Sequence, residues 1–226
     1  MPITRRGTAN SLLWIETEIM AAEYIRINPS NPDSKSLNRV VDCLKAGGVI
    51  VYPTDTVYGI GCDMENVKAV ERVARIREMD PKQVNFAIIC HNLSHLSSFA
   101  SVGTNVFKMM KKAFPGPFTF LLKANKKLPS SFQDRRSIGI RIPDNEIPLQ
   151  IVEKLGNPII TTSVHDDDTI IDYTTDPSAI YENFKDKVDI VIDAGFGNNI
   201  PSTIIDCTGD DPVILRQGLG NVDAIF

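Results

Sequence analysis

Long apolar runs and paired cysteines are both missing from this chain of 226 residues. No apolar stretch approaches the roughly 20 residues that a membrane-spanning helix needs, and the N-terminus lacks the ordered regions of a signal peptide. The four cysteines are scattered, so neither a zinc site nor a disulfide framework is indicated. We therefore expect a cytoplasmic protein with reduced thiols and no membrane partner.

Several familiar catalytic signatures are also absent. The chain has no phosphate-binding loop ending in Gly-Lys-Ser/Thr, no dinucleotide-binding glycine fingerprint and no Gly-x-Ser-x-Gly elbow. Its three histidines, His91, His95 and His165, do not have zinc-ligand spacing with cysteine. The acidic run at 166–168 has the ligand type that Mg²⁺ prefers, but an acidic surface loop is the more ordinary interpretation. We predict no metal held by the protein itself.

Charge is ordinary in amount and uneven in distribution. Hydrophobic residues make up 42% and charged residues 23% of the chain, as in soluble globular proteins, and the net charge of −4 argues against general nucleic-acid affinity. The charged residues at 108–141 are nevertheless almost all lysine or arginine, while those at 163–211 are mostly acidic. This asymmetry indicates either a basic face for phosphates or RNA, or charges that interleave once folded. Composition leaves both open.

The hydrophobic periodicity predicts one α/β domain. Residues 1–19 have no clear period and are predicted to be an irregular arm or non-native extension, followed by a single domain over 20–226. Helices are predicted at 35–46, 66–79, 104–114, 147–155 and 177–184. Strands are predicted at 24–28, 49–52, 86–90, 117–123, 137–143, 158–162, 188–195, 202–208 and 212–218. This order favours a twisted mixed sheet flanked by helices.

Polar side chains gather where the predicted strands end. The stretch "VIVYPTDTVYGIGCD" follows a short buried strand with hydroxyls, an acid and glycines, and arginines stand at the ends of two later strands, Arg141 and Arg216. Ligands in open α/β sheets bind near such strand ends, and arginine pairs with phosphate or carboxylate through two hydrogen bonds. A Thr-rich turn or a strand-end arginine alone is more often structural. Their convergence favours a site for an anionic ligand.

Seven motifs occur in an order and spacing that resemble one known family. They are "GGVIVYPTDTVYGIGCD", "FPGPFTFLLK", "IGIRIPDNEIPLQIVEKLG", "PIITTS", "VDIVIDAG", "PSTIIDCT" and "VILRQG". From about residue 35 to residue 220 the chain resembles the YrdC/YciO family, whose active members are L-threonylcarbamoyladenylate synthases. The resemblance implies a single twisted α/β domain with a large concave, partly basic cavity.

The resemblance also implies a reaction and its partners. Threonine, bicarbonate and ATP would give threonylcarbamoyl-AMP and pyrophosphate, with Mg²⁺ accompanying ATP. A tRNA threonylcarbamoyl-transfer enzyme would then modify adenosine 37 of certain tRNAs to t6A. A carbamate oxygen attacks the α-phosphate in this chemistry, so the protein chiefly positions the reactants and neutralises charge.

Site residues follow from the same resemblance. The substrate-binding residues would be Thr54, Thr56, Tyr58, Thr119, Arg141 and Ser202, with Thr54 offering its hydroxyl to threonine and Arg141 holding the threonine carboxylate. The nucleotide-binding residues would be Arg77, Ser163, His165 and Arg216. The catalytic residues would be Arg77, Lys82 and Ser163.

The chain departs from the synthase pattern at two motifs. The usual lysine–any–arginine pair reads Arg77 and Met79, which leaves Lys82 as the cation to compensate, and the family's Ser-x-Asn reads Ser163-Val164-His165. These changes resemble the YciO branch. Loss of one oriented charge reduces such a rate by on the order of 10²–10³.

Three functions are therefore weighed. The first is a synthase, active or slow, and the alternative is a YciO-type double-stranded RNA or nucleotide-binding protein with weak or lost synthase activity. A side domain of a larger carbamoyl-transferring protein is disfavoured, because zinc-finger and acylphosphatase-like segments are not found in these residues.

Overall fold

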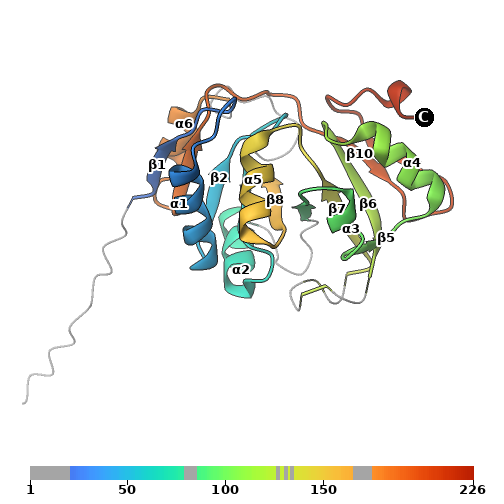
Figure 1. Ribbon diagram of the computed structural model, residues 1–226, viewed down its shortest axis with the longest axis horizontal. Coiled ribbons are helices and arrows are strands. Elements are labelled where there is room, and N and C mark those ends of the chain that lie inside the picture. The colour runs from blue at the N-terminus through green and yellow to red at the C-terminus, as the bar shows by residue number, and fades with distance from the viewer. Residues whose placement is uncertain (1–20, 79–85, 126–127, 130–131, 133–134, 165–174) are drawn as a thin grey trace, which may run out of the picture.

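One mixed β-sheet runs through the molecule (Figure 1). The computed structural model describes residues 21–78, 86–125, 128–129, 132, 135–164 and 175–226. Within them the strands are β1 (Glu23–Arg26), β2 (Ile50–Tyr52), β3 (Gly59–Gly61), β4 (Ala87–Ile89), β5 (Ala100–Ser101), β6 (Phe118–Ala124), β7 (Ser137–Arg141), β8 (Ile159–Ser163), β9 (Ile190–Asp193), β10 (Thr203–Asp206) and β11 (Val213–Arg216). The helices are α1 (Ser34–Lys45), α2 (Val67–Ile76), α3 (Leu93–Leu96), α4 (Thr104–Ala113), α5 (Glu146–Leu155) and α6 (Pro177–Phe184), followed by the 3₁₀ turn η3 (Val222–Ala224).

The strand order makes the sheet mixed and open. It runs β1-β9-β2-β3-β8-β4-β7-β6-β10-β11, with β5 paired to β6 at one end. The pairs β1/β9, β2/β9, β4/β7 and β6/β10 are parallel, and the remaining pairs are antiparallel. Because β1 and β11 lie at opposite edges, the sheet does not close into a barrel. The prediction of a single-domain α/β fold on a mixed sheet is confirmed.

Strand register separates the two faces of the sheet. Ile160, Ile88, Ile140 and Phe120 are successive partners across four strands, and none is exposed. The adjacent row, Thr161, Ala87, Gly139 and Leu121, has smaller or polar side chains and faces the other way. Since side chains alternate along a strand, one face packs into the core and the other is left to line a cavity.

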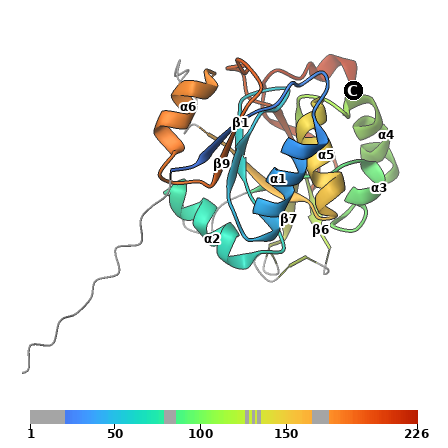
Figure 2. The same cartoon turned by 60° about the vertical axis from the view of Figure 1, so that its left-hand side comes forward.

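Helix α1 forms where the sequence supplies both a cap and an apolar stripe. In α1, Leu37, Val40, Val41 and Leu44 are buried on one side, and the carboxylate of Asp33 accepts from the N–H of Ser36. Helices α1 and α5 lie side by side over the sheet (Figures 1 and 2). The apolar stripes of both helices are therefore buried in the hydrophobic core, and α5 contacts β4 directly.

Every helix and strand predicted from periodicity is present, with ends shifted by a few residues. Four short elements of the described residues were not predicted: β3, α3, β5 and the 3₁₀ turn η3. Strand β3 contains two glycines in three residues, so neither β-branched composition nor alternation marks it. The predicted arm at 1–19 lies outside the described residues. In the part of the chain that is described, no helix is long and apolar enough to cross a membrane.

Candidate functional site

The turn after β2 is held by one threonine hydroxyl. Oγ1 of Thr54 donates to the carbonyl of Val57 at 2.7 Å and accepts from the N–H of Thr56 at 3.0 Å. Hydroxyl bonds of this kind replace backbone bonds that a turn leaves unmade. The threonine-rich sequence therefore first serves to fix the shape of this turn.

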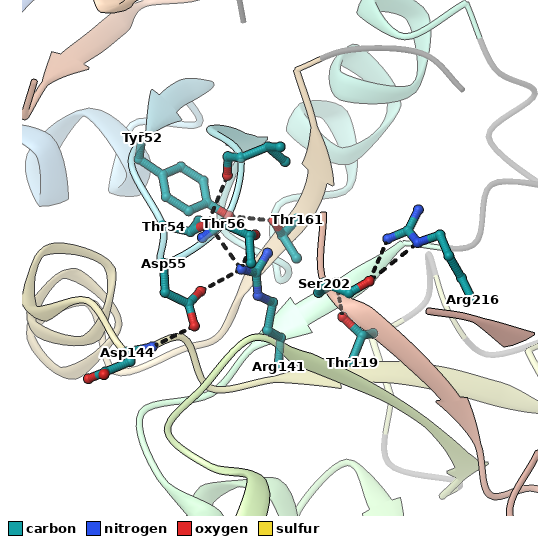
Figure 3. A network of polar contacts seen from close by, with 11 residues as sticks. Tyr52, Thr54, Asp55, Thr56, Thr119, Arg141, Asp144, Thr161, Ser202 and Arg216 are labelled. Atoms are coloured by element: carbon teal, nitrogen blue, oxygen red, sulfur yellow. Dashed lines mark hydrogen bonds and ion pairs between the residues drawn. The ribbon is translucent and has the colours of Figure 1, made fainter. Parts of the chain in front are cut away.

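Arg141, at the end of β7, extends into the same turn (Figure 3). Its Nη2 donates to Oγ1 of Thr54 at 3.0 Å, to Oδ1 of Asp55 at 2.6 Å and to Oγ1 of Thr56. The other carboxylate oxygen of Asp55 accepts from the N–H of Asp144 at 3.1 Å. Charge-assisted bonds of this kind are the strong ones in a protein interior. They hold the guanidinium in one orientation.

The guanidinium retains donor capacity beyond these contacts. The Arg141 side chain is 8% exposed, and its Nε has no hydrogen-bond partner in the described part of the chain. Buried N–H groups are nearly always satisfied in native proteins, so an exception requires an explanation. Arg141 also lines a cavity, so its guanidinium is the positive charge that an anionic ligand would meet there.

The cavity has a volume of about 310 Å³, at the lower end of the range for small-molecule sites. It lies on the face of the sheet and includes the row Thr161, Ala87, Gly139 and Leu121. A methyl group at Gly139 would lie 2.9 Å from Cβ of Ala87. The absence of a side chain at Gly139 therefore leaves space in the cavity above this strand.

A second cluster of polar side chains lies across the cavity floor from Arg141 (Figure 3). Oγ1 of Thr119 lies 2.9 Å from Oγ of Ser202, and Nη2 and Nε of Arg216 donate to the carbonyl of Ser202 at 3.0 and 3.3 Å. The Thr119–Ser202 pair thus separates two arginines that line one cavity. Such a site suits a ligand with two anionic groups.

The structure brings most of the predicted site residues together. Those that line the cavity are Tyr58, Thr119, Arg141, Ser163, Ser202 and Arg216. Thr54 and Thr56 lie directly behind Arg141 and contact its guanidinium. Arg77 is buried, caps the end of α2, and donates from Nη1 to the carbonyl of Val164 at 3.2 Å. Lys82 and His165 lie outside the described residues.

Other residues of the site were not predicted. Asp55 orients Arg141, while Ala87, Gly139 and Leu121 form the floor. Gly139 carried a usable signal, since a glycine inside a strand marks a close approach. The role of Asp55 depends on a contact across 86 residues, which no local pattern reveals.

Metal-binding side chains are not clustered in the described residues, where no group of three or more His, Cys, Asp or Glu could hold an ion. The carboxylate beside the cavity, Asp55, is already paired with Arg141. The acidic run at 166–168 lies outside the described residues. The described site therefore offers no ready-made Mg²⁺ cage.

A family model decides the wider relationship. The Sua5/YciO/YrdC model, described as "Telomere recombination", matches residues 42–218. This chain belongs to the Sua5/YciO/YrdC family. The predicted family is therefore confirmed, and the cavity described above lies within the matched region.

Relatives within the Sua5/YciO/YrdC family include proteins of similar length. The chain is 38% identical to the "Uncharacterized protein YciO" of Escherichia coli K12 over 204 residues, which cover 89% of this chain and 98% of that protein. The crystal structure of E. coli YciO matches with a TM-score of 0.84 and 37% identity, covering 91% of this chain and all of that one.

A second family structure contains a ligand. The crystal structure of P. abyssi Sua5 complexed with L-threonine matches with a TM-score of 0.77 and 25% identity. The match covers 86% of this chain and 57% of the Sua5 chain. The shared fold thus extends from YciO to a member that binds an amino acid.

Proposed function

We propose that this protein is a threonylcarbamoyl-AMP synthase-like enzyme, which forms threonylcarbamoyl-adenylate from threonine, bicarbonate and ATP. The observation that carries the proposal is the buried guanidinium of Arg141, which lines the cavity while Asp55 fixes its orientation. A carboxylate is the natural acceptor for such a group. The threonine complex of the Sua5 relative supports an amino acid as a ligand of this fold.

The two arginines suit the two ends of the proposed substrates. Arg141 would hold the threonine carboxylate, and Arg216, across the Thr119–Ser202 pair, would contact the phosphates. The threonine amine and bicarbonate would give a carbamate and water. A carbamate oxygen would then attack the α-phosphate, with pyrophosphate leaving. Orientation and charge neutralisation are the contributions that such a site makes to phosphoryl transfer.

Thr54 has a different task in this proposal from the one expected of it. Its hydroxyl already donates to Val57 and accepts from Thr56 and Arg141. The same oxygen therefore acts through Arg141, which it helps to hold, rather than as a separate contact with threonine. Mg²⁺ enters this scheme with ATP as part of the substrate. Downstream, a threonylcarbamoyl-transfer enzyme and tRNA would use the adenylate for t6A37.

The test is threonine-dependent pyrophosphate release from ATP, Mg²⁺ and bicarbonate. We expect release by the wild type and a fall of about 10²-fold or more in Arg141→Lys and Arg216→Gln, since each removes one oriented charge contact. Arg39→Gln is the matched control, because Arg39 pairs with Glu23 at the surface and should leave the rate unchanged. Wild-type release that does not require threonine, or equal rates in all variants, would refute the proposal.

A second candidate is a nucleotide- or double-stranded RNA-binding protein with weak or lost synthase activity. The observation that favours it is Arg77, whose Nη1 bonds to the carbonyl of Val164 and which is absent from the cavity lining. A cation withdrawn from the phosphates would leave binding without fast turnover. Threonine and ATP binding without pyrophosphate release, together with RNA affinity that falls steeply with salt, would favour this candidate.

A further inference from the structure

The side chain of Tyr52, on β2, extends across strand β3 and reaches β8. Its ring is fully buried and lies against Gly59 and Gly61, where a methyl group would lie 3.0 Å from Cζ and 3.3 Å from Cε1 respectively. Tyr52 is the direct partner of Gly59 in the β2/β3 pair, so both share one face of the sheet. The two glycines of "YGIG" therefore leave a channel in which the ring lies flat across the strand.

At the end of this channel the phenol meets one hydroxyl. Oη of Tyr52 donates to Oγ1 of Thr161 at 2.6 Å (Figure 3). A methyl group at Gly59 would lie 3.2 Å from that same Oγ1. Thr161 is 6% exposed and belongs to the row that forms the cavity floor. The contact thus joins a residue of the core to a residue of the cavity.

The direction of this bond determines where the threonine proton points. Burial raises the pKa of Tyr52, so its phenol keeps its proton at physiological pH. A fully buried O–H must donate, and Thr161 supplies the acceptor that the structure records. The oxygen of Thr161 is then used as an acceptor on its Tyr52 side. The O–H bond of Thr161 must therefore point in another direction. The described part of the chain holds no acceptor for it.

We propose that Thr161 is a ligand-contacting residue whose hydroxyl proton is aimed into the cavity by Tyr52. Its partner is an oxygen of an anionic ligand, carboxylate or phosphate, because the guanidinium of Arg141 lines the same cavity and supplies the positive charge. Tyr52 is a positioning residue that acts through Thr161. The inference uses the cavity of the proposed function but does not require that reaction.

The test is a double-mutant cycle on ligand affinity, measured by titration calorimetry with three probes: L-threonine, ATP and inorganic pyrophosphate. Thr161→Val removes the hydroxyl at nearly constant shape, and we expect about tenfold weaker binding of at least one probe. Thr161→Ser keeps the hydroxyl and should restore most of the affinity. Tyr52→Phe should weaken the same probe about three- to tenfold. The double variant should bind no more weakly than Thr161→Val alone.

A matched control separates positioning from general loss of stability. Tyr24→Phe removes a phenol hydroxyl from β1, away from this cavity, and should leave all three affinities unchanged. Effects of Tyr52→Phe and Thr161→Val that simply add would show that Tyr52 does not act through Thr161. Wild-type affinity in Thr161→Val would overturn the assignment altogether.

The panel also separates this inference from the proposed function. If pyrophosphate binds and shows the non-additive cycle while threonine and ATP do not bind, the synthase proposal is wrong and the assignment of Thr161 holds. If the wild type binds none of the three probes, both are wrong.

Discussion

Arg141 and Asp55 form an ion pair in the interior, with 2.6 Å between Nη2 and Oδ1 and with side chains only 8% and 9% exposed. Arg39 and Glu23 form the contrasting pair at the surface, 2.9 Å apart, with side chains 65% and 44% exposed. The same chemistry at two depths allows a direct comparison. Burial removes water as an alternative partner, so a broken pair should matter far more inside than outside.

Asp55→Asn should lower the free energy of unfolding by about 3 kcal/mol or more, because it leaves the buried guanidinium of Arg141 without its counter-charge. Glu23→Gln should lower it by no more than about 1 kcal/mol, as is usual for exposed pairs. Urea unfolding followed by circular dichroism measures both. Equal losses in the two variants would show that the Arg141–Asp55 pair is solvated.

Gly61→Ala should destabilise the protein through a clash with backbone. A methyl group at Gly61 would lie 2.0 Å from the carbonyl oxygen of Ile160, which cannot rotate away. We expect a loss of about 1–3 kcal/mol, the range for overpacking. Gly103→Ala is the control, since nothing lies within 4 Å of the added methyl group. If the thermal unfolding midpoints of the two variants agree, the close approach of β3 and β8 is not real.

The fold follows from the sequence to a large extent because periodicity and caps are local. Helix α1 could be predicted from its apolar spacing and from Gly47-Gly48 after it, and β6 from its apolar residues. Strand β3 could not be predicted in this way. Gly59 and Gly61 leave space for the ring of Tyr52, and this contact forms only in the folded protein.

The site was predicted in composition but not in connectivity. Arg141 and the hydroxyls of Thr54 and Thr56 were expected near one ligand, and the structure joins them by hydrogen bonds. What sequence reasoning could not supply is that the Thr54 hydroxyl is already used by the turn, or that Asp55 bonds to Arg141 from 86 positions away. Local patterns indicate which residue types collect, while contacts across the sheet decide their roles.

Acid should weaken the fold through Asp193. Burial raises the pKa of this carboxyl, but the N–H of Gly195 and the side chains of Arg26 and Tyr24 outweigh it, so the pKa lies below its ordinary value. A lowered folded-state pKa gives stability that is complete above the unfolded value of about 3.9 and is lost as pH falls through the folded value.

Unfolding free energies measured from pH 6 to pH 2 test this expectation. The wild type should lose stability below about pH 4, and Asp193→Asn should show a shallower decline over the same interval, because it has no such proton to bind. The difference should shrink in high salt, since the Arg26 side chain is 83% exposed and its charge is screened. Identical slopes in the two proteins would exclude Asp193 as the source.

The outer strand β11 should promote self-association. Val213, Ile214 and Leu215 are 56%, 43% and 55% exposed, and in the described part of the chain β10 is the one strand paired with β11. An exposed apolar edge offers unpaired N–H and carbonyl groups to another chain.

Sedimentation velocity over a range of concentrations should show association of the wild type and a weaker effect in Val213→Lys, whose charge opposes strand addition. Val67→Lys, on the surface of α2, is the control: Val67 is 38% exposed but lies on no sheet edge. If both lysine variants reduce association equally, net charge is the cause and the edge of β11 is not.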